Sequence, residues 1–381
     1  MGCHSAGNIA PFSLTTCGDA RTVANLIAGT TRARTMPPRG VRNTEEYTTN
    51  LGWKGDIHLS DQEIDALEAW SEAGAPEGDP GDAPPAFVPQ SRDLPRMTHE
   101  IHPSNPYVTS GDKDEFRCFV IDPGLTEDTY LNGLQVVTGN PKVVHHPVIS
   151  VDPERSSEKL AGPDGSFECG ATLGSIPGGM INAWAPGSDP LDLPERVGSL
   201  IPEGSLILMQ IHYHPAGATA DPDTTRVQLR LDKEKPKYGF SYQLLGNFEQ
   251  PVNEFGSGLL PDPDDTKGVE LLIAADSPHH VETQQVAVPA AGSPLAPYFP
   301  TFPGMRIHGE FLHMHYLGFD QKVTITRPNA PPGKPMEECL MHAPGWAARL
   351  TFSTQCSETA QARASKARAA LYFAGPLYST D

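Results

Sequence analysis

Three groups of histidines in this sequence have the residue types and spacing of a metal site. The groups are His145-His146, His212 with His214, and His313 with His315. Each lies in an apolar stretch typical of a β-strand, and an apolar flank keeps water and competing ligands from a metal. Imidazole binds copper, zinc, iron and nickel, and copper is our first expectation. A single strand histidine is usually a packed core residue, but three groups in one chain predict a metal site assembled from distant strands.

Strand alternation places the members of two of these groups together. Alternate residues of a strand share a face, so His212 and His214 point the same way. Gln210, two residues before His212, lies on that face too. The same rule puts His313 and His315 on one face of their strand. Two histidines spaced in this way are close enough to bind one ion, and a methionine ligand would further favour copper.

The adjacent pair His145-His146 needs a local irregularity, because neighbouring residues of a regular strand point to opposite faces. Both imidazoles can reach one metal only at a β-bulge or a strand end, and Pro147 directly after them favours such a break. A similar pair, His279-His280, follows a polar turn and has no apolar flank. We expect that pair to be a surface feature.

The N-terminal residues contain part of a haem-attachment pattern. Cys3-His4 would complete a Cys-x-x-Cys-His motif if one more cysteine preceded Met1, so we expect the sequence to be incomplete at its start. With His4 as one axial ligand, a c-type haem takes a methionine as the other, and Met36 in a Met-Pro-Pro segment is the candidate. The alternative is a small helical cap that binds no haem.

Helical patterns are strongest in the first part of the chain. Residues 19–28 and 60–75 are predicted helices, and Ser60 starts the second with a capping-box pattern. The Pro-, Gly- and Asp-rich residues that follow have the composition of a linker. We therefore expect a small helical domain at 1–78 and a linker at 79–95.

Short apolar runs separated by Gly, Pro and Asp follow the linker, and this pattern predicts a mainly β fold. The runs cover residues 116–121, 134–137, 143–151, 205–214, 225–231, 269–274, 305–319 and 321–325. Their spacing indicates two antiparallel β-sandwiches in tandem, which we place at 96–225 and 226–381. Residues 357–374 form an atypical tail with an Ala- and Arg-rich helical composition.

Four of the six cysteines fall into two well separated pairs, Cys118 with Cys169 and Cys339 with Cys356. Each pair could close one loop of a β domain by a disulfide, which would place the protein in an oxidising compartment. The alternative is four buried free thiols in a cytosolic protein. Cys17 has no evident partner and is expected to be a buried free thiol.

The composition limits the classes of partner. With 47 acidic and 28 basic residues, the net charge of −19 argues against nucleic acid or an anionic membrane surface as a partner. No run approaches the roughly 20 apolar residues of a membrane span. At 381 residues, with 36 Gly and 39 Pro, the chain is long enough for two or three domains rich in turns.

The order of the histidine motifs resembles that of a known family. Val-Val-His145-His146, then Met-Gln-Ile-His212-Tyr, then Leu-His313-Met-His315-Tyr-Leu-Gly is similar to the copper type II, ascorbate-dependent monooxygenases, which include peptidylglycine α-hydroxylating and dopamine β-monooxygenases. The resemblance covers residues 96–356. The region before it resembles the cytochrome c-like modules fused to bacterial members.

The resemblance implies two jelly-roll-like β-sandwich domains, each with one copper, behind a small α-helical cytochrome c-like domain. His145, His146 and His212 would hold the copper that stores and delivers an electron. His313 and His315 would be the catalytic pair, holding the copper at which O2 is bound and a substrate C–H bond is hydroxylated.

The match to the family is not complete at every position. Gln210 matches a family glutamine near the first copper, whereas His214 matches no family ligand. The family's second copper has a methionine as its third ligand, and no methionine follows Met341 here. The arginine that some members place before the His-x-His strand is absent from the segment at Glu310, which argues against a peptide-glycine substrate. An incomplete or frame-shifted reading frame would explain the missing cysteine and the atypical tail together.

These expectations combine into one functional hypothesis and one alternative. The hypothesis is a periplasmic or secreted copper-dependent monooxygenase that uses two copper ions, O2 and ascorbate or another reductant. Haem c, bound by Cys3, His4 and Met36, would be a fused electron donor, and the substrate would be a small molecule or a peptide. The alternative is a non-catalytic copper or haem electron-transfer or metal-binding protein, in which the missing methionine leaves the second site incomplete.

Overall fold

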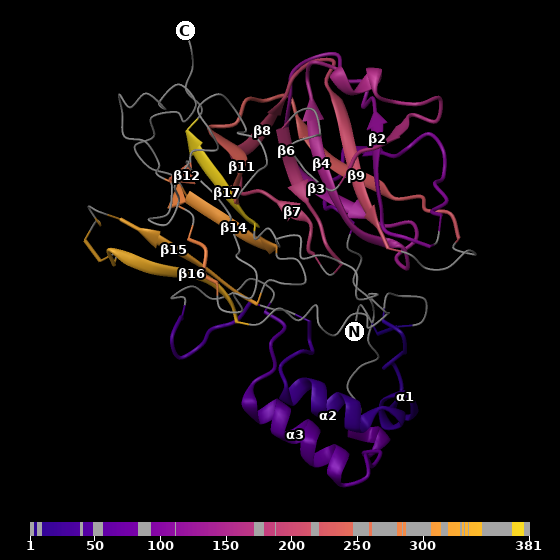
Figure 1. Ribbon diagram of the computed structural model, residues 1–381, viewed down its shortest axis with the longest axis vertical. Helices are drawn as coiled ribbons and strands as arrows, with labels where there is room; N and C mark the ends of the chain where they lie inside the picture. The colour runs from indigo at the N-terminus through magenta and orange to yellow at the C-terminus, as the bar shows by residue number, and fades with distance from the viewer. Residues whose placement is uncertain are drawn as a thin grey trace.

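The computed structural model has a mainly β fold with three α-helices near its N-terminus (Figure 1). It describes residues 4–5, 10–38, 41–48, 56–82, 93–110, 112–170, 179–186, 188–214, 221–246, 259–260, 280–283, 285–286, 306–313, 319–327, 330, 332–333, 335–344 and 368–376. The mainly β class predicted from the short apolar runs is therefore confirmed. None of the described helices is long and apolar enough to cross a membrane.

The helices lie together at one end of the molecule, apart from the sheets (Figure 1). They are α1 (Cys17–Thr22), α2 (Ala24–Arg32) and α3 (Asp61–Glu72), and a short 3-10 turn, η1 (Pro80–Asp82), follows α3. The helix expected at 19–28 is split at Val23. The capping box predicted at Ser60 is confirmed, because its hydroxyl accepts from the Glu63 amide while the Glu63 carboxylate accepts from the Ser60 amide.

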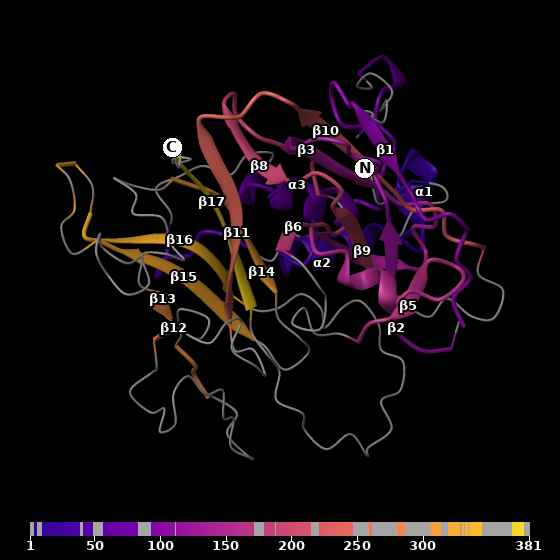
Figure 2. The same cartoon turned by 90° about the horizontal axis from the view of Figure 1, so that it is seen from above.

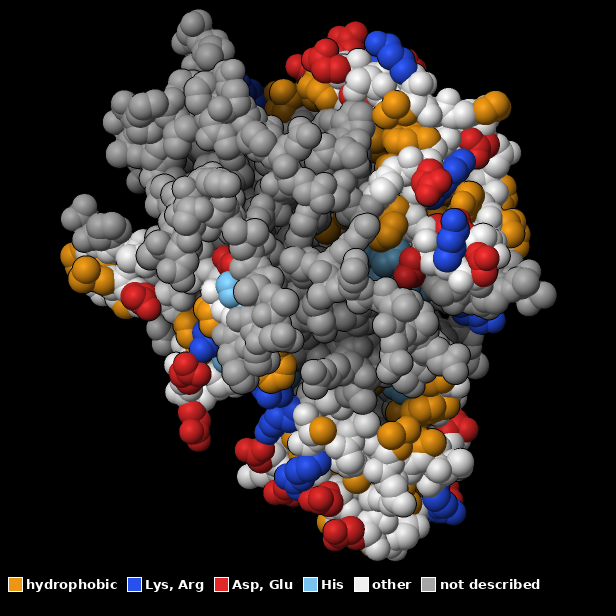
Figure 3. Space-filling model, in the orientation of Figure 1, with side chains coloured by type: hydrophobic (Ala, Val, Ile, Leu, Met, Phe, Trp, Pro, Cys, Tyr) orange, Lys and Arg blue, Asp and Glu red, His pale blue; other side chains and the backbone are white. Residues whose placement is uncertain are grey.

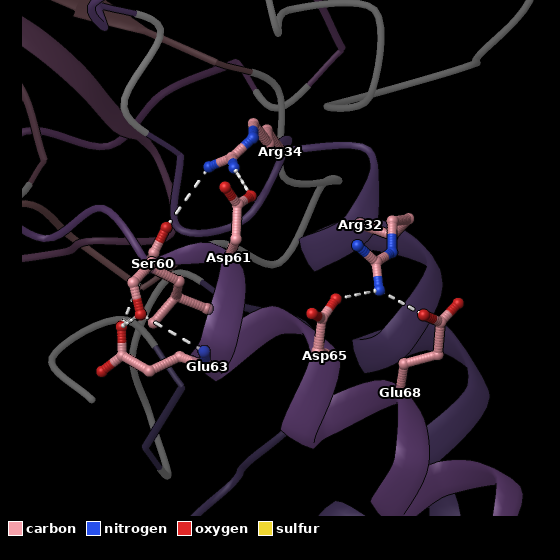
Figure 4. Close-up of polar contacts among 8 residues, drawn as sticks. Arg32, Arg34, Ser60, Asp61, Glu63, Asp65 and Glu68 are labelled. Carbon is pink, nitrogen blue, oxygen red and sulfur yellow. Dashed lines mark hydrogen bonds and ion pairs between the residues drawn. The ribbon is translucent and has the colours of Figure 1, made fainter.

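Helices α2 and α3 are joined by charged side chains on their solvent side (Figure 4). Arg32 pairs with Asp65 at 2.7 Å and with Glu68, and Arg34 pairs with Asp61. Charges of both signs cover this end of the molecule (Figure 3). Such exposed pairs contribute little to stability, so the packing of buried Ile64 from α3 matters more.

Two sheets make up most of the remaining structure. The larger has the order β1 (His99–Ile101), β10 (Arg226–Asp232), β3 (Thr129–Val137), β8 (Val197–Ile201), β11 (Tyr238–Gly246), β17 (Arg368–Pro376) and β14 (Arg306–His313), with β7 (Leu191–Asp192) beside β3. The smaller has the order β5 (Ser166–Glu168), β2 (Glu115–Ile121), β9 (Leu206–Tyr213), β4 (Val144–Asp152) and β6 (Gly179–Ala183). The 3-10 turn η2 (Ser156–Lys159) follows β4.

One apolar core lies between these two sheets. From β9 it takes Ile207, Met209 and Ile211, which alternate along the strand and are fully buried, and from the larger sheet it takes side chains such as Leu131 and Leu229. Alternation leaves the other residues of β9 on the opposite face of the smaller sheet. That face carries the histidines.

The two facing sheets also contact residues on both sides of the range 96–225. Strand β10 begins at Arg226 and pairs with β1 and β3, so the expected boundary at 225/226 falls before a strand of the first sandwich. In the expected linker, Leu94 is buried, and its amide donates to Gln228 on β10 at 2.8 Å. The end of the linker therefore belongs to the sandwich.

A short parallel pairing continues the larger sheet into the second half of the chain. Tyr238 and Gly239 of β11 lie opposite Val197 and Gly198 of β8. A Cβ at Gly198 would lie 3.1 Å from the Leu131 carbonyl oxygen, so this close approach favours glycine. The two halves of the chain thus share one backbone ladder.

The second half of the chain adds strands to that ladder and two separate strand pairs. The pairs are β12 (Leu259–Leu260) with β13 (Gln285–Val286), and β15 (Asp320–Thr326) with β16 (Glu337–Pro344). Residues 368–376 of the tail, expected to be helical, form β17 between β11 and β14 instead. Pairing along both edges overrides a weak helical propensity. A second sandwich stays a prediction, and the run at 269–274 lies outside the described residues.

A segment from the N-terminal region docks on the β15–β16 hairpin, which lies apart from β2, β4 and β9 (Figures 1 and 2). The Arg42 amide donates to the His342 carbonyl at 2.9 Å, and the Thr44 hydroxyl bonds the His342 ring at 3.0 Å. The other His342 ring nitrogen lies 2.9 Å from Asp320. Tyr47 donates to the Val323 carbonyl.

Candidate metal centre

Strands β4 and β9 bring two of the predicted histidine groups together. In the antiparallel register His146 lies opposite His212, while Val144 lies opposite Tyr213, so His145 is an extra residue in the ladder. This is a β-bulge, and it confirms the irregularity that adjacent ligands required. The bulge lets two consecutive side chains turn toward the same neighbour.

The δ nitrogen of His145 lies close to those of two other histidines at this bulge. His145 Nδ1 lies 3.0 Å from His146 Nδ1 and 3.2 Å from His212 Nδ1. Two nitrogens bound to one metal at about 2.0 Å in tetrahedral geometry are roughly 3.3 Å apart, so these spacings need only a small expansion. The residues therefore fit a transition-metal ion with an imidazole ligand set.

His214, for which the resemblance supplied no role, lies in the same cluster. It follows the end of β9, and its ring centroid is 4.0 Å from that of His145. His145, His212 and His214 each offer one ligand atom within 4.8 Å of the other two. Strand alternation had placed His214 on the same face as His212, and the two rings do lie together.

Asp114 also belongs to this site, and the sequence analysis missed it. One carboxylate oxygen lies 2.5 Å from His214 Nδ1 and 3.3 Å from His212 Nε2. Asp114 directly precedes β2, the strand that pairs with β9. Only this long-range pairing brings it to the histidines, and no local pattern in the sequence could have indicated it.

A disulfide supports β9 from the same face of the sheet. Cys118 on β2 is bonded to Cys169, as one of the two predicted pairs required. Cys118 lies opposite Gln210, whose amide donates to the Gly170 carbonyl at 2.9 Å. Gln210 is therefore anchored two residues before His212. The partner proposed for Cys339, Cys356, lies outside the described residues, so that disulfide stays a prediction.

Aromatic and polar contacts hold the residues around the cluster. The Phe116 ring stacks on His212 with centroids 4.2 Å apart, and the His212 side chain is only 13 % exposed. On the core side, the Tyr213 hydroxyl donates at 2.8 Å to Asp223, which is buried. Histidine surface is visible on the sandwich beside acidic and apolar side chains (Figure 3).

Burial perturbs the two tyrosines beneath the site. The pKa of Tyr107 is raised to about 12, mainly by burial and further by its 2.6 Å hydrogen bond to Glu115. Burial and the neighbouring Asp223 carboxylate raise the pKa of Tyr213 as well. Hydrogen bonds from Ser110 and Tyr107 outweigh the effect of burial on Glu115 and lower its pKa. Both tyrosines therefore stay protonated and donate to carboxylates at neutral pH.

The histidine pair His313 and His315 is described only in part. His313 is the last residue of β14, and Arg368 of β17 lies opposite it in the ladder. The His313 side chain and the whole of His315 lie outside the described residues. Their assignment to a second metal site stays a prediction.

The residues predicted to bind haem are also only partly described. Cys3 lies outside the described residues. His4 Nδ1 is 3.1 Å from the Phe12 carbonyl oxygen, which leaves Nε2 as the available ligand atom. Met36 lines a cavity of about 10 Å³ together with His58, which is space for a single water molecule. The described residues do not by themselves form a haem pocket, so haem binding stays a prediction.

No protein-family model and no curated protein matches this sequence. The candidate metal centre therefore stands on its own geometry: three histidines with ligand atoms within 4.8 Å of one another, a fourth whose Nδ1 lies 3.0 Å from that of His145, and one carboxylate that contacts two of the four rings.

Proposed function

We propose that this chain is a copper-dependent monooxygenase that hydroxylates an organic substrate with O2 and an external reductant. The observation that carries the proposal is the histidine cluster at the β4 bulge, where His145 Nδ1 lies 3.2 Å from His212 Nδ1 and 3.0 Å from His146 Nδ1. The order of the histidine motifs, which resembles the copper type II monooxygenases, supports copper as the metal. Copper bound there would take up and release single electrons.

The residues around the cluster have defined tasks in this proposal. His212 stacks on the Phe116 ring, its Nε2 lies 3.3 Å from the Asp114 carboxylate, and its Nδ1 faces His145. Gln210 and the Cys118–Cys169 disulfide hold β9 and β2 in register next to the ligands. Holding ligands on interior strands keeps the site in one geometry when the metal changes its charge.

In this proposal, the substrate reacts at the histidine pair His313 and His315. His313 and His315 would hold the copper at which O2 and the substrate meet, by the resemblance alone. The substrate would be a small molecule or a peptide, with ascorbate or another reductant as the electron source, and haem c on His4 and Met36 as a fused donor. The disulfide supports a periplasmic or secreted location, because such bonds persist in oxidising compartments.

Copper loading of the full chain tests the proposal. Anaerobic addition of Cu(I) is expected to give two tightly bound equivalents, and His145→Ala and His313→Ala are each expected to lose a different one. His99→Ala on exposed β1 is the matched control and should keep both. Retention of both equivalents in His145→Ala would overturn the metal assignment.

Oxygen consumption tests the electron-transfer role separately. His212→Ala is expected to abolish reductant-dependent O2 uptake. The copper equivalent assigned to His313 should remain bound in this variant. Full O2 uptake in His212→Ala would contradict the role of the first site.

The alternative is a copper or haem electron-transfer or metal-binding protein without catalysis. The absence of any methionine after Met341 favours it, because the family's second copper uses such a ligand. One copper equivalent that disappears only in His145→Ala, with no O2 uptake, would select this alternative.

A further inference from the structure

We propose that His214 is a fourth protein ligand of the first metal site and that Asp114 is the carboxylate that orients it. The site would then be a closed set of four imidazoles rather than the three that the motif resemblance implies. This inference rests on the metal site of the proposed function, but not on the monooxygenase reaction.

The geometry of Asp114 selects the ligand atoms. Its Oδ1 accepts from His214 Nδ1 at 2.5 Å, so the Nε2 atom of His214 is left for a metal. The same oxygen lies 3.3 Å from His212 Nε2 in an ion-pair contact, and Nδ1 of His212 faces His145 Nδ1 at 3.2 Å. A carboxylate behind a histidine is the usual way in which proteins fix the orientation of a metal-bound imidazole.

The position of His214 is also fixed through its backbone. Its amide donates to the Val143 carbonyl at 2.8 Å, which ties the residue after β9 to the start of β4. Its ring centroid lies 4.0 Å from that of His145 and 4.9 Å from that of His212. His145, His212 and His214 therefore offer ligand atoms within 4.8 Å of one another, and His146 lies beside this group at 3.0 Å from His145.

Four protein ligands would leave no coordination position open for a small molecule. A metal with four protein ligands has no open position, whereas catalytic sites keep one for water or substrate. The first site would therefore exchange electrons without binding O2 or any small exogenous ligand. Asp114 is a positioning residue, since it touches the imidazoles and not the ion.

Ligand counting on copper tests the inference. The full chain would carry His313→Ala and His315→Ala, so that the first site alone binds one equivalent of copper. X-ray absorption is expected to give four imidazoles on Cu(I) and Cu(II) in this parent and three in the added His214→Ala variant. Added azide should leave the Cu(II) spectrum of the parent unchanged and should alter that of His214→Ala.

Asp114 is tested in the same background. Asp114→Asn is expected to weaken copper affinity by roughly 10- to 100-fold and to shift the reduction potential while four imidazoles remain bound. Asp114→Glu should restore part of the affinity. Asp112→Asn, a change at a nearby exposed carboxylate bonded to Ser110, is the matched control and should do neither.

The outcomes separate this inference from the proposed function. Three imidazoles in the parent, or azide binding to the parent, would overturn the fourth ligand even if His214→Ala failed to fold. If His145→Ala and His212→Ala also left the imidazole count of the parent unchanged, the metal site of the proposed function would fail as well.

Discussion

The two main histidine groups differ in how the fold holds them. His146 and His212 face each other across β4 and β9, two interior strands of the smaller sheet, and a bulge adds His145. His313 ends β14, the last strand in the order of the larger sheet, and the residue opposite it is Arg368. Two strands thus supply the first group, whereas of the second group only the backbone of His313, on β14, is among the described residues.

This difference shows that two histidines on one strand do not by themselves make a metal site. Two histidines two residues apart share a face on any strand, whatever lies beside it. A third ligand must come from another strand, and its position depends on register and on the rigidity of the support. The first group meets these conditions within the described residues.

The largest effect is expected from removing the support beneath the first group. Replacing Cys118 and Cys169 together by alanine should lower the free energy of unfolding by about 2–4 kcal/mol, because the bond links residues far apart in the chain. Copper affinity of the first site should fall, and that of the His313 pair should not. Urea unfolding and copper titration measure both, with Cys17→Ala as control. Equal weakening of both sites would erase the contrast between them.

The buried hydroxyl below the first group gives the next effect. Tyr213→Phe should destabilise the protein by about 1–3 kcal/mol, since buried Asp223 loses a donor. Urea unfolding provides the measurement. Tyr130→Phe is the comparison, because the described structure shows no hydrogen bond to the Tyr130 hydroxyl. A similar loss in both variants would show that ring packing, and not the hydrogen bond, is responsible.

A smaller effect is expected at the hairpin beside the second half of the larger sheet. Thr44→Val removes the hydroxyl that bonds the His342 ring and should cost about 0.5–1.5 kcal/mol. Hydrogen exchange of the Arg42 amide should accelerate while amides of β9 stay protected. Thr48→Val, which loses a hydroxyl that bonds within its own segment, is the control. Faster exchange throughout β9 would mean that the two regions unfold together.

The smallest expected effect is at alkaline pH. The pKa of Tyr107 is raised from 10.0 to about 12 in the folded protein, so the unfolded chain loses this proton first. The stability that this tyrosine contributes is therefore complete below pH 10 and is lost as the pH rises towards 12. Tyrosinate absorbance should show a group titrating near pH 12 that is missing in Tyr107→Phe, whereas Tyr213 should stay protonated in both. If Tyr107→Phe still showed the group that titrates near pH 12, the raised pKa of Tyr107 would be contradicted.

Local patterns in the sequence were enough for several parts of the structure. The capping box at Ser60, the alternation along β9 and the irregularity at His145 depend on neighbouring residues, and all three are present. Cys118 and Cys169 could be paired because the cysteines of the β region fall into two well separated local pairs. These features need no knowledge of which strands meet.

The features that escaped prediction all depend on strand pairing. Asp114 joins the histidines only because β2 lies beside β9, and no spacing in the sequence encodes that neighbour. The first sandwich includes β10 because its residues pair with β3. Residues 368–376 have a helical composition, but two neighbouring strands fix them as β17. Composition cannot report such contacts.

The parallel contact between β8 and β11 has a mechanical consequence. It is two residue pairs long, yet it joins the sheet that backs the first histidines to the strands that lead to His313. Any hinge-like motion that changed the spacing between the two histidine groups would have to bend this ladder or separate it at Gly198 and Gly239.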